Sequence, residues 1–367
     1  MRQLIRYLKN TLNPSYALSP LLLRSVSVDE MPSPIGPIVY LPAETIDCQE
    51  LPGMPVTPHM SHLQEASHSS MTATVRVLEN LIYVAECTAK NLLLSPQRKF
   101  ISESSSTMKS TRSFRWQNAR RPVCKSYKGL NMVFRGVSNN FYHALIDNLP
   151  RLMALSDTAL GLTENVRLLI PGKLSGAEAA LLELVLPDNV EVEIIEAGKS
   201  YHLERCLFAT FATRQFSGFV PSAYLDWLGK HVLPQRERKA NRLIYISRQK
   251  APKRRLLNED EMIACVKGYG FEVFNLEDLS LSEQIELFYD AKCVIGLHGA
   301  GFTNLVFSSG LQVIELFPYQ WVKPSYYFLT KAVGGHYHYV VGEGDEINVD
   351  VALPVNLVRE RIEGLAL

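Results

Sequence analysis

The hydrophobic positions follow two patterns along most of the chain, one typical of buried strands and one typical of amphipathic helices. Short apolar runs alternate with longer segments in which apolar residues recur every three or four positions. We expect strands at residues 131–135, 166–170, 190–195, 206–211, 243–246, 271–274, 293–297 and 313–317, with a looser strand-like pattern over 72–100. We expect helices over residues 138–149 and 177–186, from residue 258, from residue 280 and after a glycine-rich turn at residue 299. This alternation predicts an α/β fold with parallel sheets and helices on their faces.

Several residues predict where these helices begin and end. Asn258 with Glu261, and Ser280 with Glu283, have the spacing of a capping box, in which the two residues satisfy each other's backbone N–H groups. Pro150 is expected to kink or restart the helix that precedes it, because proline has no backbone N–H to donate.

Two features divide the chain into regions. Nine of the twenty prolines lie between Pro14 and Pro58, which favours an irregular, extended segment. The charged run Arg236–Lys239 separates two consecutive α/β series. We therefore expect a Pro-rich N-terminal extension packed on the body (1–70), an N-terminal Rossmann-like domain (71–235), a C-terminal Rossmann-like domain (236–345) and a C-terminal tail or helix (346–367).

Composition narrows the classes of function. The 367 residues carry 38 Lys and Arg against 37 Asp and Glu, and this balanced charge argues against a nucleic-acid partner. No apolar run has the length of a transmembrane helix. The six cysteines form no C-x-x-C pair, which favours reduced thiols and a cytoplasmic location. Leu4, Ile5 and Leu8 would share one side of a short N-terminal helix, either a solvated helix or a weak contact with a membrane surface.

The strongest chemical signal is the segment 296–304, which reads Gly-Leu-His-Gly-Ala-Gly-Phe-Thr-Asn. A predicted strand ends here and a predicted helix follows, so free N–H groups and the helix dipole could attract a phosphate. The glycine spacing, G-x-x-G-x-G, differs from the dinucleotide fingerprint G-x-G-x-x-G, which weakens a dehydrogenase interpretation. Tight strand-to-helix packing is the alternative explanation.

Two more features lie where the carboxyl ends of parallel strands are expected to meet. The strand 243–246 is followed by five cations in eight residues, Arg248, Lys250, Lys253, Arg254 and Arg255. Arginines in such a loop can bind a diphosphate with paired hydrogen bonds. Glu315, in the strand 313–317, could accept both hydroxyls of a ribose. The alternatives are a solvated loop and a glutamate that faces the edge of its strand.

A third candidate is the pair His143 and Asp147, which are four residues apart in a predicted helix and so share one face. Such a pair suits proton abstraction from a hydroxyl, with one member as the base and the other as its support. A structural role for the pair is the alternative.

Five segments in this order resemble glycosyltransferase family 61, over about residues 131–339. The segments are 140–147, 246–248 with 254–259, 270–273, 298–304 and 313–318. The resemblance implies a GT-B architecture, in which two Rossmann-like domains face each other across a cleft. It also implies inverting transfer of a sugar from a nucleotide-diphosphate donor, usually a UDP-sugar, to a glycan or glycolipid hydroxyl, as in capsule and other polysaccharide biosynthesis.

The resemblance also implies roles for individual residues. The nucleotide-sugar would be held by Arg248, Arg254, Asn258, His298, Gly299, Ala300, Gly301, Asn304 and Glu315. His143 and Asp147 would supply the base for the acceptor hydroxyl; we favour Asp147, and the reverse assignment is the alternative. The chain has no D-x-D motif of the kind that holds a divalent ion on a diphosphate, so we expect no metal and no other cofactor.

Two other classes of function stay open at this point. One is a nucleotide-sugar epimerase, which would use the same donor site without an acceptor. The other is a non-catalytic relative that binds a nucleotide-sugar or a glycan. In every case we expect a cytoplasmic protein, with peripheral contact at the inner membrane face as an option and the oligomeric state open.

Overall fold

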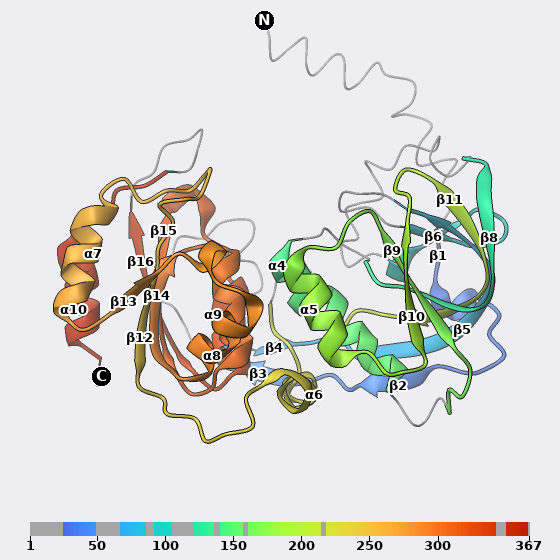
Figure 1. Cartoon of the computed structure of the whole chain (residues 1–367), viewed down its shortest axis with the longest axis horizontal. Helices are drawn as coiled ribbons and strands as arrows, with labels where there is room; N and C mark the ends of the chain where they lie inside the picture. The colour runs from blue at the N-terminus through green and yellow to red at the C-terminus, as the bar shows by residue number, and fades with distance from the viewer. Residues whose placement is uncertain are drawn as a thin grey trace, which may run out of the picture. The chain divides into compact units, whose positions relative to one another are not determined.

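The structure, a computed structural model, describes eight stretches of the chain. They are residues 25–48, 67–85, 92–104, 121–135, 140–156, 161–213, 218–342 and 350–365. The chain forms two compact units: Met1–Tyr40, Thr72–Ser175 and Leu186–Phe211 make the first, and Leu41–Met71, Gly176–Val185 and Ala212–Leu367 make the second. Both units combine sheet with helices, which confirms the α/β class (Figure 1). The predicted domain boundaries and the GT-B arrangement stay predictions.

The main sheet of the second unit has five parallel strands. They are β12 (Arg242–Ile246), β13 (Glu272–Phe274), β14 (Ala291–Leu297), β15 (Gln312–Pro318) and β16 (His336–Gly342). Their order across the sheet is β13-β12-β14-β15-β16, and every neighbouring pair is parallel. The chain thus starts inside the sheet, moves one strand to one side and then three strands to the other, which is the doubly wound order.

Helices cover both faces of this sheet (Figure 1). One face carries α7 (Glu259–Gly268) and α10 (Val355–Glu363), and the other carries α8 (Leu281–Tyr289) and α9 (Ser325–Ala332). A 3-10 helix, η9 (Ala300–Phe307), joins β14 to β15. The same unit contains α5 (Gly176–Val185), α6 (Ser222–Val232) and the antiparallel pair β3 (Thr45–Asp47) and β4 (Ser67–Ser69).

One of the two predicted capping boxes is confirmed and the other is wrong. At α8, the Ser280 and Glu283 side chains each accept a hydrogen bond from the other's backbone N–H. At α7, Asn258 occupies the N-cap position, but its side chain makes no cap bond. Its amide instead bonds both backbone groups of Leu353, at 2.9 and 3.1 Å, and is therefore unavailable to the helix.

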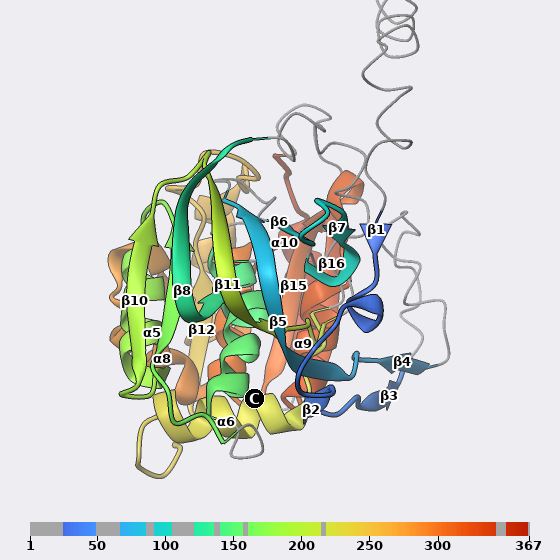
Figure 2. The ribbon, with the colours of Figure 1, turned by 90° about the vertical axis from the view of Figure 1, so that its right-hand side faces the viewer.

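The first unit has a mixed sheet, which includes a run of four neighbouring parallel strands (Figure 2). These are β8 (Val123–Val133), β9 (Val166–Pro171), β10 (Val190–Ile195) and β11 (Ser200–Ala209), in the order β11-β8-β9-β10. The long strand β5 (Ala73–Val84) pairs with β11 in the antiparallel direction. Beyond β5, the sheet continues with β6 (Leu92–Leu94), β7 (Phe100–Ile101) and β1 (Ser25–Val26). Strand β2 (Ile38–Leu41) also pairs with β5.

Two strands of this sheet begin earlier than predicted. Strand β8 was expected only from residue 131, and β11 only from residue 206. The first four residues of β8 are exposed and only its last four are continuously buried, so an apolar run marks only the end of the strand. The strand-like pattern over residues 72–100 is confirmed by β5, β6 and β7.

The predicted helix over residues 138–149 is present from Phe141 but is not a regular α-helix. One turn of α-helix, α4 (Phe141–His143), leads into a π-helical turn, η5 (Ala144–Asn148), and then a 3-10 helix, η6 (Leu149–Leu155). Pro150 lies in the first turn of η6, which confirms that the helix restarts there. Residues 138 and 139 lie outside the described residues.

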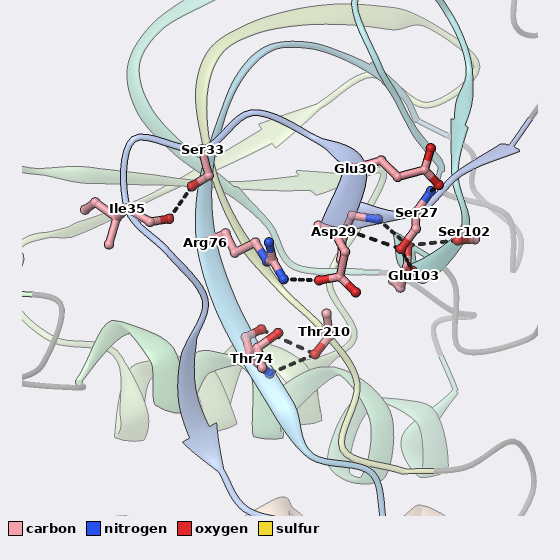
Figure 3. Close-up of polar contacts among 11 residues, drawn as sticks. Ser27, Asp29, Glu30, Ser33, Ile35, Thr74, Arg76, Ser102, Glu103 and Thr210 are labelled. Carbon is pink, nitrogen blue, oxygen red and sulfur yellow. Dashed lines mark hydrogen bonds and ion pairs between the residues drawn. The ribbon is translucent and has the colours of Figure 1, made fainter.

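Polar side chains fasten the segment 25–40 to the first unit (Figure 3). Glu103 accepts hydrogen bonds from the Ser27 hydroxyl at 2.8 Å and from the Val28 N–H at 2.9 Å. Arg76, on β5, pairs with Asp29. The expected helix over the first ten residues and most of the Pro-rich stretch lie outside the described residues.

Two general expectations can be compared with the described residues. Five of the six cysteines lie among them, and all five are free thiols. In the described part of the chain, no helix combines the length and the apolar character needed to cross a bilayer.

Candidate functional site

The candidate site of the second unit lies where strands β12 and β14 end side by side. The two strands are parallel neighbours, and the chain leaves β12 in one direction and β14 in the other. Such a topological switch point is the usual ligand crevice of a doubly wound sheet. Arg248 follows the end of β12, and His298 and Gly299 follow the end of β14, so the sheet brings two sequence-predicted segments together.

The basic loop after β12 is held in a fixed shape by its own hydrogen bonds. The Arg248 N–H donates to buried Glu259 at 2.9 Å, and the Arg248 guanidinium donates to the carbonyls of Lys253 and Arg254, both at 2.9 Å. Arg254 has a φ of +55°, a left-handed backbone conformation that residues other than glycine rarely adopt. Its guanidinium donates to the His298 carbonyl at 3.3 Å, which links the loop to the turn after β14.

Cations gather around this link. Lys323 and Arg254 both lie over the Trp321 ring, at 4.2 and 5.7 Å from its centre. Burial lowers the pKa of Arg248 and of Arg254, and the charge of Arg254 lowers the pKa of Arg248 further. Burial and the charge of Arg254 also lower the pKa of Lys323. Partly desolvated like charges at close quarters create a strong positive potential, which an anionic ligand would relieve.

The glycines of the turn have two different roles. A Cβ atom on Gly299 would lie 2.2 Å from the Arg248 guanidinium, so glycine lets this arginine lie against the turn. A Cβ atom on Gly301 would lie 2.9 Å from the Leu276 side chain and 3.3 Å from that of Ile246, so glycine there permits close packing. Ala300 and Gly301 are half-buried.

Glu315 and His298 form a buried pair. The Glu315 carboxylate is fully buried, and its two oxygens interact with His298 Nδ1 at 2.5 Å and with the Tyr337 hydroxyl at 2.6 Å. Burial raises the pKa of Glu315 well above its usual value. Neither oxygen of Glu315 is exposed, so the predicted contact with a ribose has no free carboxylate oxygen in the structure. Glu315 instead holds the His298 ring in place.

Asn258 and Asn304, also predicted to bind the nucleotide-sugar, contact protein groups in the structure. Asn304 is fully buried, and its amide donates to Gln284 and to the Gly301 carbonyl, both at 3.0 Å, which ties η9 to α8. Asn258 bonds the backbone of Leu353, as described above. Backbone bonds from Val351 to Arg255 and from Leu257 to Val351, at 3.0 and 2.7 Å, continue this contact. The segment 350–353 therefore acts as a strap that fastens the end of the basic loop.

The first unit places the predicted pair His143 and Asp147 in direct contact. His143 Nδ1 lies 2.5 Å from Asp147 Oδ2, with His143 at the end of α4 and Asp147 in the π-helical turn. The Asn140 side chain accepts a hydrogen bond from the His143 N–H at 2.9 Å and so caps this turn. The Asp147 side chain is 9% exposed and that of His143 20%, so both are sheltered but not sealed from solvent. Single π-helical turns occur often at functional sites.

Several residues of these two regions carried no signal in the sequence. Three of them belong to no sequence motif: Trp321, Lys323 and Tyr337. They lie near the site only because β15, β16 and the segment between these strands fold beside it. Arg151 is buried in the first unit, where it donates to the carbonyls of Phe134 and Ala209, both at 2.9 Å. In the sequence, Arg151 is only a single arginine within an apolar stretch, which does not predict this role.

Two comparisons show which known proteins this chain resembles. Residues 141–314 match the family model described as Glycosyltransferase 61. Beta-1,2-xylosyltransferase XYXT1 of Oryza sativa subsp. japonica is 26% identical over 195 residues, which cover 47% of this chain and 40% of the rice protein. The chain thus matches less than half the length of this curated relative. The residues that match the family model include the His143–Asp147 pair, the basic loop and the glycine turn, so the chain is similar to glycosyltransferase family 61 over slightly less than half of its length.

Proposed function

We propose that this chain is an inverting glycosyltransferase that moves a sugar from a nucleoside-diphosphate donor to a glycan hydroxyl. The observation that carries the proposal is the cluster of Arg248, Arg254 and Lys323 at the switch point of a doubly wound sheet, within or beside the region that matches the family. The GT-B arrangement and a role in polysaccharide biosynthesis belong to this proposal. Because the rice relative is named a xylosyltransferase, UDP-xylose is the first donor to test.

The donor diphosphate is bound by charge. Arg248 and Arg254 are semi-rigid because their loop is internally hydrogen-bonded, so little side-chain entropy is lost when they bind an anion. Their guanidinium groups can each make paired hydrogen bonds to phosphate oxygens. Lys323 adds a third positive charge, and the N–H groups of Ala300 and Gly301, in the first turn of η9, would be further donors to the diphosphate. These groups stabilise the leaving diphosphate without a metal ion.

Asp147 accepts the proton of the acceptor. The acceptor oxygen attacks the anomeric carbon from the face opposite the diphosphate, the bond from that carbon to the phosphate oxygen breaks, and the hydroxyl proton passes to the carboxylate. His143, in contact with Asp147, fixes the orientation of the carboxylate. Attack from the opposite face inverts the anomeric configuration.

A panel of nucleotide-sugars tests the proposal. The purified chain is incubated with UDP-xylose, UDP-glucose, UDP-N-acetylglucosamine and GDP-mannose, with and without oligosaccharide acceptors, and both free nucleotide and glycan product are measured. We expect release of UDP from one UDP-sugar and a product of inverted configuration. Isomerised donor would indicate an epimerase, and binding without turnover would indicate a non-catalytic relative.

Variants of the basic loop connect turnover to the cluster. Arg248→Ala and Arg254→Ala should each weaken donor binding by about 1.5–3 kcal/mol, the range for a charged hydrogen bond. Lysine at either position should restore only part of the loss, because it cannot make paired bonds. Lys250→Ala is the matched control, because Lys250 lies in the same loop but pairs with Asp278 on the surface. Unchanged affinity in both arginine variants would refute the assignment.

A further inference from the structure

A cavity of about 550 Å³ in the first unit includes none of the residues that we propose for the transfer reaction. Its lining comes from three segments: residues 26–34, Glu79 and Asn80 on β5, and residues 95–99 between β6 and β7. All three segments belong to the first unit and precede residue 141, where the match to the family model begins. The similarity to the family therefore says nothing about this cavity.

Hydrogen bonds fix the wall that residues 26–34 form. Strand β1 pairs with β7 at the start of this segment, and the Ser27 side chain bonds Glu103 just after it (Figure 3). Farther along, the Ser33 hydroxyl lies 2.8 Å from the Val77 carbonyl of β5. Proline at positions 32 and 34 stiffens the segment further, because its ring fixes φ. A wall that already has its shape loses little entropy when a ligand binds.

The other two walls contain backbone conformations that residues other than glycine rarely adopt. Asn80 has a φ of +56°, and Arg98, in the turn between β6 and β7, has a φ of +58°. Four residues other than glycine have a positive φ in the described part of the chain, and two of them lie at this cavity. Such conformations persist where neighbouring contacts hold them, and they often gather at binding sites.

Polar groups of the cavity are available to a ligand. Ser95 is 1% exposed, and its Oγ accepts a hydrogen bond from the Lys99 N–H at 3.2 Å. Within the described stretches, the hydroxyl hydrogen of Ser95 has no acceptor, so a ligand oxygen can take that place. The exposed side chains of Glu79, Asn80 and Gln97 offer further donors and acceptors.

The rest of the lining is apolar. Val26 and Met31 are buried, and Pro32, Pro34 and Pro96 add rigid rings. A pyranose sugar suits this combination, because hydroxyl groups project from the rim of its ring while CH groups form its two faces. Its hydroxyls can bond the polar side chains while its CH faces cover the apolar ones.

The formal charges of the lining favour a neutral ligand. Glu30 and Glu79 bring two negative charges, and Lys99 brings one positive charge. An anion, such as a nucleotide or a chain of uronic acids, would meet a net negative charge. A neutral sugar avoids this repulsion, since carboxylates accept hydrogen bonds from its hydroxyls and an ammonium group donates to them.

We propose that this cavity binds one neutral sugar unit of the acceptor glycan, other than the unit that reacts. The inference rests on the proposed function, which supplies the glycan. A glycan held here by one unit remains attached to the protein, so its reacting hydroxyl is present at a raised effective concentration. The cavity contributes affinity for the acceptor and no chemistry, so its loss should raise the acceptor KM and leave kcat unchanged.

Calorimetry with neutral oligosaccharides tests the site in the absence of any donor. Xylohexaose, cellohexaose and mannohexaose are titrated into the full chain, and hexagalacturonate serves as the anionic counterpart. We expect at least one neutral hexasaccharide to bind, and hexagalacturonate to bind more weakly than that hexasaccharide. Failure of all three neutral probes to bind, or tighter binding of hexagalacturonate, overturns the inference.

Two substitutions locate the bound sugar. Asn80→Gly removes an amide group and places at this positive φ the residue that tolerates it best. Gln97→Ala removes a second amide from an exposed position of the turn. Each should weaken binding of the hexasaccharide by roughly 3–10-fold, the effect of one hydrogen bond. Glu191→Ala is the matched control, because Glu191 is an exposed polar residue of the same sheet outside the cavity. Wild-type affinity in both cavity variants overturns the inference.

Kinetics separate this inference from the proposed function. With a donor that turns over and the hexasaccharide as acceptor, Asn80→Gly and Gln97→Ala should raise the acceptor KM by the same factor as the dissociation constant. Both kcat and the dissociation constant of the donor should stay unchanged. Turnover with an unchanged acceptor KM overturns the inference and leaves the transferase standing. Hexasaccharide binding that the variants weaken, in a chain that turns over no nucleotide-sugar, overturns the proposed function and leaves the sugar site standing.

Discussion

The two candidate regions of this chain are built in different ways. In the second unit, both arginines of the cluster lie in the loop after β12, beside the turn after β14, and each is held by hydrogen bonds to backbone carbonyls. In the first unit, His143 and Asp147 depend on one irregular helical turn and on contact with each other. The proposed diphosphate binding would therefore depend on the topology of a whole sheet, whereas the proposed proton transfer would depend on the placement of a few atoms. Substitutions should therefore separate the two functions.

The largest effect is expected at Asp147. Asp147→Asn keeps the size of the side chain but removes the proton acceptor, and should lower turnover by about 10²–10⁴-fold, the usual contribution of general acid–base catalysis. The dissociation constant for the nucleotide-sugar, measured by calorimetry, should change little. His143→Ala should cost less than Asp147→Asn. Near-normal turnover in Asp147→Asn would remove the assignment, and lost donor binding would make Asp147 a structural residue.

The next effect concerns the stability of the first unit. Arg151→Ala removes both hydrogen bonds to the buried carbonyls of Phe134 and Ala209 and leaves a cavity, and should lower the free energy of unfolding by about 2–4 kcal/mol. Arg167→Ala is the control, because Arg167 pairs with Glu193 at a partly exposed position and should cost less than about 1 kcal/mol. Denaturant unfolding measures both. Equal losses would show that burial of Arg151 contributes nothing special.

A smaller effect should distinguish the two glycines of the turn. Gly299 has an extended φ of 178°, so alanine fits the backbone there but pushes the Arg248 guanidinium away. Gly299→Ala should weaken donor binding roughly tenfold, the loss of about one charged hydrogen bond, with little change in stability. Gly301→Ala should instead lower stability by about 1 kcal/mol or more, because its Cβ meets Leu276 and Ile246. The same result for both variants would contradict the separate roles given to them.

The smallest expected effect is that of metal removal. Activity should survive excess EDTA, because we assign the diphosphate to cations and backbone N–H groups. Turnover is compared before chelation, after chelation and after addition of manganese. Activity that is lost on chelation and restored by manganese would reverse this assignment.

Much of the second unit could be predicted from its sequence, because its central strands β14 and β15 are almost continuously buried. Four of its five main-sheet strands lie within two residues of the apolar runs that predict them. Strand β16 escaped prediction because its first four residues, His-Tyr-His-Tyr, are polar or aromatic and only partly buried. In the first unit, β8 and β11 begin with exposed or polar positions, so their lengths could not be read from apolar runs.

Some of the site residues could likewise be predicted from the sequence, and others could not. Arg248, Arg254, His298 and Gly299 lie in segments whose composition marks them, and the parallel sheet brings them together as predicted. Asn258 and Asn304 belong to the same segments but are used for fastening, which only their buried contacts reveal. A motif predicts which segment approaches a ligand, but the choice among its side chains depends on three-dimensional neighbours.

The strap over residues 350–353 has a consequence for the order of folding. It fastens a loop that lies 95 residues earlier in the chain, and strands β13 to β16 are synthesised between the two. Contacts of such long sequence separation form late, because a large loop must close before they can be made. We therefore expect amide protons of residues 255–258 to gain protection in pulse-labelled refolding only after those of β12 and β14. A second unit caught midway would have its sheet in place while residues 255–258, at the end of the basic loop, still lacked their bonds to the strap.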